Sequence, residues 1–180
     1  MKKEYLLLNL MLLFLAFSCH NKDVKMEGLV KTYYDNGIIK SEINYKDGKK
    51  DGLSITYYDN GNIKSKKNYI DDEEDGLCIW YYGDGQIESE TNYINGKEDG
   101  LSKMYYDSGE VFNECNFING ELSGSCNGYY KNGLLREERT YKNNKEHGLS
   151  RLYYENGQIK AEANFDEGIQ INSTKTYELN

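Results

Sequence analysis

The feature that most constrains the fold of this chain is a glycine that recurs every 24 residues. It stands at Gly28, Gly52, Gly76, Gly100, Gly124 and Gly148, without a slip in the spacing. A fixed period of this length is the signature of a repeat architecture, in which each unit packs on its neighbours. Six full units therefore occupy residues 28–171. Residues 172–180 hold a remnant of a seventh unit, with Tyr177 at its first tyrosine position, and we expect them to cap the array.

A pair of tyrosines follows each of these glycines by five and six residues, and an Asn-Gly, Asp-Gly or Ser-Gly dipeptide comes soon after it. The pairs are Tyr33-Tyr34, Tyr57-Tyr58, Tyr81-Tyr82, Tyr105-Tyr106, Tyr129-Tyr130 and Tyr153-Tyr154. Asn-Gly between two runs rich in Tyr and Ile is a strong signal for a β-hairpin with a type I′ turn. If Asn36-Gly37 is a two-residue loop, Tyr34 pairs with Ile39 and Thr32 pairs with Ser41.

A second turn signal ends each unit, as at Asp47-Gly48 in the first one. Hairpin therefore follows hairpin, and the sequence predicts an all-β fold. It is an elongated antiparallel meander of six 24-residue β-hairpin repeats that forms a twisted open sheet or trough. The chain contains no proline, which suits ladder strands. Tyr34, Ile39, Thr32, Ser41 and Tyr45 then share one face. We expect this face to be the core side, because Lys40 and its neighbours make the other face polar.

The N-terminus has the pattern of an export signal. Lys2 and Lys3 precede an apolar run over residues 5–17, too short to span a membrane as a helix. The run ends in Leu-Ala-Phe-Ser before Cys19, which resembles the bacterial lipobox. We therefore expect residues 1–18 to be a lipoprotein signal peptide and residues 19–27 a tether lipidated at Cys19. An ordinary cleaved signal and an uncleaved anchor are the alternatives.

The repeated pattern GLxxxYYxNGxIKSExNY resembles the MORN-repeat variant of bacterial proteins, many of which carry the label "toxin-antitoxin system YwqK family antitoxin". The resemblance covers residues 28 to about 177. It implies an elongated β-hairpin array used as an interaction scaffold, and it implies no catalytic residues. An exported immunity protein is compatible with the signal segment, whereas a cytoplasmic antitoxin is not.

Little in the sequence points to catalysis or to a metal. The two histidines, His20 and His147, have no nucleophile at a predictable distance, so we expect no enzyme activity, no cofactor and no metal site. The acidic run at residues 71–75 lacks the alternating ligands of a calcium loop and is interpreted as a turn. A net charge of -8 argues against nucleic-acid binding. Trp80 replaces a threonine on the core-side face, where packing is favoured over a role as a ligand platform.

The cysteines allow one internal pairing. Cys78 and Cys126 occupy equivalent positions two units apart, too far for a bridge. Cys115 and Cys126 lie on consecutive strands. They stand directly opposite if residues 118–123 form the loop, and diagonally if the loop tightens to Asn119-Gly120, so their disulfide stays open at this point.

These features favour a membrane-anchored lipoprotein of the bacterial cell envelope, expected at the outer membrane, that acts as a non-catalytic scaffold for a protein partner. The candidate interaction surface is the row of first tyrosines: Tyr33, Tyr57, Tyr81, Tyr105, Tyr129 and Tyr153. Tyrosine offers a large contact area and loses little side-chain conformational entropy on binding, because it has few rotatable bonds. A cell-wall or carbohydrate-binding repeat protein is an alternative, since paired aromatic residues can stack on sugars. A toxin-binding antitoxin or immunity protein is another.

Overall fold

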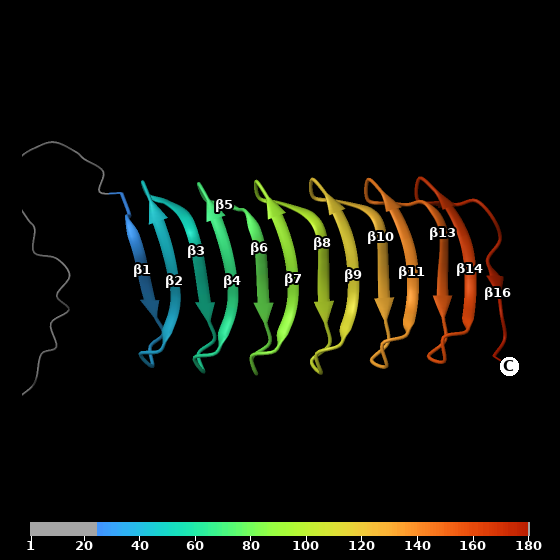
Figure 1. Cartoon of the computed structure of the whole chain (residues 1–180), viewed down its shortest axis with the longest axis horizontal. Coiled ribbons are helices and arrows are strands. Elements are labelled where there is room, and N and C mark those ends of the chain that lie inside the picture. Colours follow the sequence, from blue (N-terminus) through green and yellow to red (C-terminus); the bar gives the residue numbers. More distant parts are fainter. Residues whose placement is uncertain (1–24, 180) are drawn as a thin grey trace, which may run out of the picture.

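The computed structural model describes residues 25–179, and its regular elements in this range are all β-strands (Figure 1). The strands are β1 (Gly28–Tyr33), β2 (Ile39–Lys46), β3 (Lys49–Tyr57), β4 (Ile63–Ile70), β5 (Glu73–Glu74), β6 (Gly76–Tyr81), β7 (Ile87–Ile94), β8 (Lys97–Tyr105), β9 (Val111–Ile118), β10 (Glu121–Tyr129), β11 (Leu135–Lys142), β12 (Lys145–Glu146), β13 (Gly148–Tyr153), β14 (Ile159–Asp166), β15 (Ile169–Gln170) and β16 (Lys175–Thr176).

All sixteen strands belong to one antiparallel sheet in which each long strand pairs with its neighbours in the sequence. The predicted all-β meander is therefore confirmed. Figure 1 shows the strands side by side in one row from β1 to β16, so the sheet stays open and forms a single layer. The short strands β5 and β12 are the parts of two units where the long strand is interrupted before Gly76 and Gly148. Elsewhere the same segment is continuous, as in β3.

The loop inside each hairpin differs from the predicted two-residue turn. In the first unit the amide of Tyr34 donates to the carbonyl of Ile38, and the amide of Gly37 donates to the carbonyl of Tyr34. Only Gly37 has a positive φ, of 82°. The loop therefore has three residues, with a type I turn followed by a left-handed glycine, because a type I′ turn would also need positive φ at Asn36. All six units repeat these two hydrogen bonds.

This loop corrects the predicted pairing of Tyr34 with Ile39. Tyr33 pairs with Ile39 instead. The register shifts by one residue between Thr32 and Tyr33, and Thr32 pairs with Ser41 as predicted. Paired residues of an antiparallel ladder share a face. Ile39 therefore lies on the face of Tyr33 rather than on the predicted core side.

The type I′ turns lie at the opposite ends of the strands, between successive hairpins. Asp47 and Gly48 have φ values of 52° and 87°, and the flanking residues Lys46 and Lys49 pair directly. The other five turns of this kind also have two positive φ values: Asp71-Asp72, Asn95-Gly96, Asn119-Gly120, Asn143-Asn144 and Glu167-Gly168. All the turns of one kind thus lie along one edge of the strand row, and the three-residue loops lie along the other (Figure 1).

The 24-residue glycine marks a β-bulge. Between Ile43 and Tyr45 of β2 the register with β3 shifts, and Gly52 in the shifted segment has a φ of 95°. A residue with a side chain is strained in this conformation, which explains why glycine recurs here.

The two faces of the sheet differ in the size of their side chains. One face, which we call the serine face, carries the most buried residues: Ser41, Ser54, Ser65, Cys78, Thr91 and Ala163. It is the predicted core side, but small and mostly polar residues fill its centre. Neighbouring hydroxyls satisfy each other there, as between Thr56 and Ser65 at 2.7 Å. The other face, which we call the leucine face, carries Leu29, Leu53, Leu77, Leu101 and Leu149, each directly after the repeat glycine.

Side chains tie each unit to the next one along the row. The hydroxyl of the second tyrosine of a unit donates to the main-chain carbonyl of the first tyrosine of the following unit, as from Tyr58 to Tyr81 at 2.7 Å. The six bonds run from Tyr34, Tyr58, Tyr82, Tyr106, Tyr130 and Tyr154 to Tyr57, Tyr81, Tyr105, Tyr129, Tyr153 and Tyr177. Side-chain ladders of this kind stabilise long sheets that twist little.

Candidate functional site

The candidate interaction tyrosines lie on the leucine face. Tyr57 and its equivalents follow the serine-face residue before them by one position, and strand alternation directs them to the opposite face. Tyr33, in the edge strand β1, is 58% exposed, whereas the five inner members of the row are partly buried. The predicted surface residues therefore form one continuous row, although sequence reasoning did not foresee that most of their hydroxyl groups are already bonded.

A glutamate of the preceding strand accepts a hydrogen bond from most of these hydroxyls. Tyr57 donates to Glu42 at 2.7 Å and Tyr105 donates to Glu90 at 2.9 Å. The same bond joins Tyr129 to Glu114, Tyr153 to Glu138 and Tyr177 to Glu162. The partners therefore fix the rings and leave their faces and edges as the contact area.

These acids change the titration of the tyrosines. The hydrogen bond to the Glu42 carboxylate raises the pKa of Tyr57 to about 12, because the bond is lost when the phenol ionises. Burial, followed by the bond to Glu90, raises the pKa of Tyr105 to about 12. Among the five inner members of the row the exception is Tyr81, where Lys66 replaces the glutamate and its Nζ lies 5.7 Å from the ring centroid.

Apolar side chains on the same face as this tyrosine row are open to solvent. Leu53 and Leu77 are each 43% exposed and Leu101 is 38% exposed. The isoleucines that end three strands on the same face, Ile70, Ile94 and Ile118, are more than half exposed. Exposed apolar side chains that gather in one region mark interaction surfaces more often than scattered ones. The leucine face of units two to four is therefore the best candidate for a docking surface.

The serine face has a hollow of about 280 Å³ in units three and four, lined by Trp80, Glu88, Ser89, Thr91, Tyr93, Glu98, Ser102 and Met104. The ring centroids of Trp80 and Tyr93 lie 6.4 Å apart with the planes tilted by 54°. Burial raises the pKa of the Glu98 carboxyl. Sequence reasoning singled out Trp80 but favoured plain packing there. The structure places it in the wall of this hollow.

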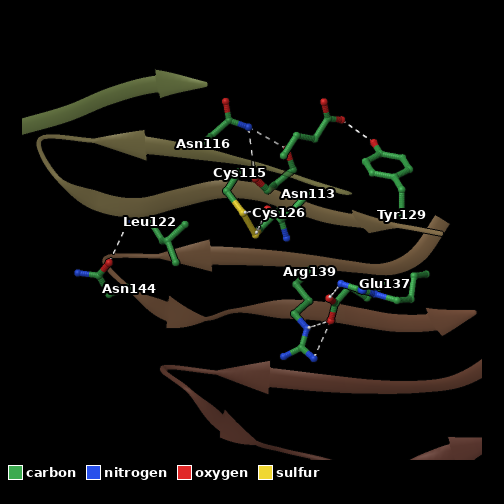
Figure 2. Close-up of a disulfide and its surroundings, with 12 residues drawn as sticks. Asn113, Cys115, Asn116, Leu122, Cys126, Tyr129, Glu137, Arg139 and Asn144 are labelled. Atoms are coloured by element: carbon green, nitrogen blue, oxygen red, sulfur yellow. Dashed lines mark hydrogen bonds and ion pairs between the residues drawn. A yellow bond between two sulfur atoms is a disulfide. The ribbon is translucent and has the colours of Figure 1, made fainter. Parts of the chain in front are cut away.

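Cys115 and Cys126 form a disulfide in the structure (Figure 2). The sequence offered a tight loop with diagonal cysteines or a longer loop with directly opposed cysteines, and the structure combines the tight loop with direct opposition. The loop is tight, since Ile118 pairs with Glu121, yet Cys115 stands directly opposite Cys126. The bulge between Leu122 and Cys126 absorbs the extra residues and restores the direct pairing.

Cys78 is buried and carries a free thiol. Burial raises the pKa of this thiol. It is therefore a structural residue of the serine face rather than a reactive cysteine.

The predicted lipidation site Cys19 and the signal peptide lie outside the described residues. Within residues 25–179, no helix is long and apolar enough to cross a membrane. In the same range, no group of three or more His, Cys, Asp or Glu side chains is arranged to hold a metal ion. The acidic run at residues 71–75 begins with the type I′ turn, where Asp72 accepts a hydrogen bond from the amide of Lys50.

Comparison with protein families finds one match that covers most of the chain. The profile of the MORN repeat variant family matches residues 26–47, 50–71, 74–95, 98–119, 122–143 and 146–167. Each matched segment begins two residues before the repeat glycine and ends at the first residue of the type I′ turn, so it holds one hairpin. No curated protein matches the sequence.

The chain also has a distant likeness to solved structures. A mutant S. aureus TarM, crystallised with Fondaparinux, alpha-GlcNAc-glycerol and UDP, is 10% identical with a TM-score of 0.37 over 67% of this chain and 21% of that one. The Glycosylation Associate Protein complex from Streptococcus agalactiae is 15% identical with a TM-score of 0.33, covering 67% and 20% of the two chains. The chain thus spans about a fifth of the length of these proteins.

Proposed function

Because the chain belongs to the MORN repeat variant family, we propose that it is a non-catalytic repeat scaffold that binds a protein partner. The observation that carries this proposal is the exposed apolar row of the leucine face beside the fixed tyrosines. Protein interfaces combine an apolar centre, aromatic side chains and a polar rim. Leu77, Leu101 and the ring of Tyr105 supply the first two, and glutamates such as Glu90, which holds the Tyr105 hydroxyl, supply the third.

The single-layer sheet supports this role. A globular enzyme encloses its site, whereas this sheet leaves both faces open along its whole length. The type I′ turns, the three-residue loops and the tyrosine bonds between units hold the surface rigid. A rigid surface loses little conformational entropy when a partner binds.

Photocrosslinking tests the docking surface. A photoreactive phenylalanine analogue at Leu77 of the full chain, expressed in its own cells, should give one discrete protein adduct. The same analogue at Lys160 of β14, outside the apolar row, is the matched control and should not give that adduct. Leu101→Asp in the Leu77-labelled chain should abolish the adduct. An adduct that survives this change, or that forms equally from both positions, would contradict the proposal.

The scaffold is further proposed to be a lipoprotein of the bacterial cell envelope, held at the outer membrane through Cys19. The order of basic residues, apolar run and cysteine supports this proposal. Two or more acyl chains give lasting attachment. Metabolic labelling with a radioactive fatty acid should mark the wild-type chain and not the Cys19→Ala variant. Equal labelling of both chains would refute the proposed lipid anchor at Cys19.

Carbohydrate binding is a second candidate, because Trp80 and Tyr93 present aromatic rings in a hollow. A glycan array probed with the wild-type chain and with Trp80→Ala tests this candidate. Binding that depends on Trp80 would favour a cell-wall ligand. An antitoxin or immunity role is a narrower form of the protein-binding proposal, and the identity of the protein crosslinked at Leu77 decides it.

A further inference from the structure

The carboxylates on the serine face are not all neutralised, although the repeats place them in equivalent positions. A glutamate stands at the same place in three units, as Glu74, Glu98 and Glu146. Each follows the third aromatic residue of its hairpin by five positions.

A basic side chain neutralises two of the three. The Nζ of Lys67 lies 2.7 Å from Oε1 of Glu74, and Arg139 lies 3.5 Å from Glu146. Lys67 and Arg139 also occupy equivalent positions, seven residues before their glutamates. In both units, a cation at the same repeat position pairs with the carboxylate at the same repeat position.

The third member of the set lacks its cation. Position 91, which is equivalent to Lys67 and Arg139, is a buried threonine bonded to Ser102. Within residues 25–179, Glu98 forms no ion pair with any basic side chain. Burial raises the pKa of this carboxyl, so the site favours a positive partner that would offset the cost of the charge.

The hollow at Glu98 has the groups that hold a cation elsewhere in this chain. Lys67 pairs with Glu74 and at the same time lies 4.7 Å from the centroid of the Trp80 ring. Trp80, Tyr93 and Glu98 line the hollow in the next unit, and Met104 and a second carboxylate, Glu88, complete it. Aromatic faces beside a carboxylate attract ammonium and guanidinium groups.

The charge of the surrounding chain favours the same ligand. Residues 52–123 contain 15 acidic and 5 basic side chains, a net charge of -10. Such a surface speeds the approach of positive ligands and repels negative ones. A volume of about 280 Å³ exceeds that of an ammonium group alone and leaves room for an alkyl chain.

We propose that this hollow binds a lysine or arginine side chain of a protein ligand, which takes the place that Lys67 and Arg139 occupy in their own units. The site lies on the serine face, opposite the docking surface of the leucine face. It takes from the proposed function only that the ligand is a protein.

Intrinsic fluorescence can report binding directly, because Trp80 is the one tryptophan of the chain. The probe is a tetralysine peptide titrated into the full chain, with the Nε-acetylated tetralysine peptide as the neutral comparison. We expect saturable change with tetralysine, weakened by salt, and none with the acetylated peptide. Equal binding of the acetylated peptide would overturn the proposal and favour a neutral ligand.

Two variants locate the site. Glu98→Gln should weaken tetralysine binding about tenfold, since one charge-assisted contact is lost. Glu146→Gln is the matched control, because Arg139 already neutralises that carboxylate, and it should bind like the wild type. Thr91→Lys should prevent binding by placing an internal amine against Glu98, as Lys67 does at Glu74. Unchanged affinity in Glu98→Gln would refute the site.

A negative result at the Glu98 hollow can be distinguished from a negative result at the docking surface of the leucine face. Photocrosslinking from Leu77 should persist in the Glu98→Gln chain, because the two sites lie on opposite faces. Loss of the Leu77 adduct with intact tetralysine binding would refute the docking surface alone.

Discussion

The hydroxyl of Tyr106 donates a hydrogen bond of 2.7 Å to the main-chain carbonyl of Tyr129, which lies 23 residues later in the next unit. The ring of Tyr106 also packs edge-on against Phe112 at 5.1 Å between centroids. One side chain thus closes its own hairpin and joins it to the following one. Six copies of this bond add a side-chain link between units to the backbone ladder that already joins them.

Removing that hydroxyl should destabilise the array measurably. Tyr106→Phe keeps the ring but leaves the carbonyl of Tyr129 without this donor, which should lower the free energy of unfolding by about 1 kcal/mol. Urea denaturation followed by circular dichroism measures the change. Tyr33→Phe is the control, because the exposed Tyr33 hydroxyl donates no bond to the described residues. Equal loss in both variants would argue against a specific role for the bond.

The tyrosine–glutamate pairs predict a loss of stability in alkali. The pKa of Tyr57 is about 12 in the folded chain, against an ordinary value of 10.0. Since the folded value is the higher one, the stabilisation is fully present below pH 10 and is lost as the pH rises through 12. Tyrosine-selective NMR should show Tyr57 titrating late, with Tyr57→Phe to assign its signal.

Repeating this titration in the Glu42→Gln variant tests whether Glu42 raises the pKa of Tyr57. Without the carboxylate, the midpoint of Tyr57 should move down toward its ordinary value, while Tyr105, which bonds to Glu90, should keep its own. A midpoint for Tyr57 that does not move would show that burial, and not Glu42, sets it.

The disulfide between Cys115 and Cys126 should contribute to stability through the short loop that it closes. Reduction should lower the free energy of unfolding by about 3 kcal/mol, by the loop-closure estimate for a loop of this size. Denaturation with and without a reductant measures this difference. The double variant Cys115→Ser and Cys126→Ser should be insensitive to the reductant; if it responds, the effect comes from elsewhere.

Deletion of one whole unit should leave a folded protein. Without residues 76–99, Tyr58 meets the carbonyl of Tyr105 in the place of Tyr81, so the tyrosine bond between units is remade. The array should shorten by roughly 10 Å, the width of two strands. Small-angle scattering gives the length and circular dichroism the strand content. Deletion of residues 76–87 instead, half a unit, should unfold the chain; a folded half-unit variant would count against the repeat as the structural unit.

The sequence predicted the strands and their order well, because the period and the turn residues repeat without a slip. It misassigned the loop at Asn36-Gly37, since a dipeptide with one left-handed glycine fits both a two-residue and a three-residue loop. The choice depends on Tyr34, which closes the loop where its hydroxyl reaches Tyr57 at 2.6 Å. That constraint comes from the next unit, and a local pattern does not contain it.

The candidate sites, like the fold, could be predicted from the sequence only in part. The row of first tyrosines could be predicted from alternation, but their glutamate partners lie 15 residues away on the neighbouring strand, as Glu42 does from Tyr57. The opposition of Cys115 and Cys126 depends on a bulge whose size no spacing rule gives. For the hollow, a signal was present: alignment of the units shows Thr91 in the place of Lys67 and Arg139.

Each second tyrosine gives its hydrogen bond toward the C-terminus, and each first tyrosine from Tyr57 onward receives one from the unit before. An inner unit therefore carries both halves of the bond that it needs. A gene that copied 24 codons in frame would produce an added hairpin whose donor and acceptor are already complementary to its neighbours. Evolution can thus alter the length of this protein in equal steps, without first inventing a new interface.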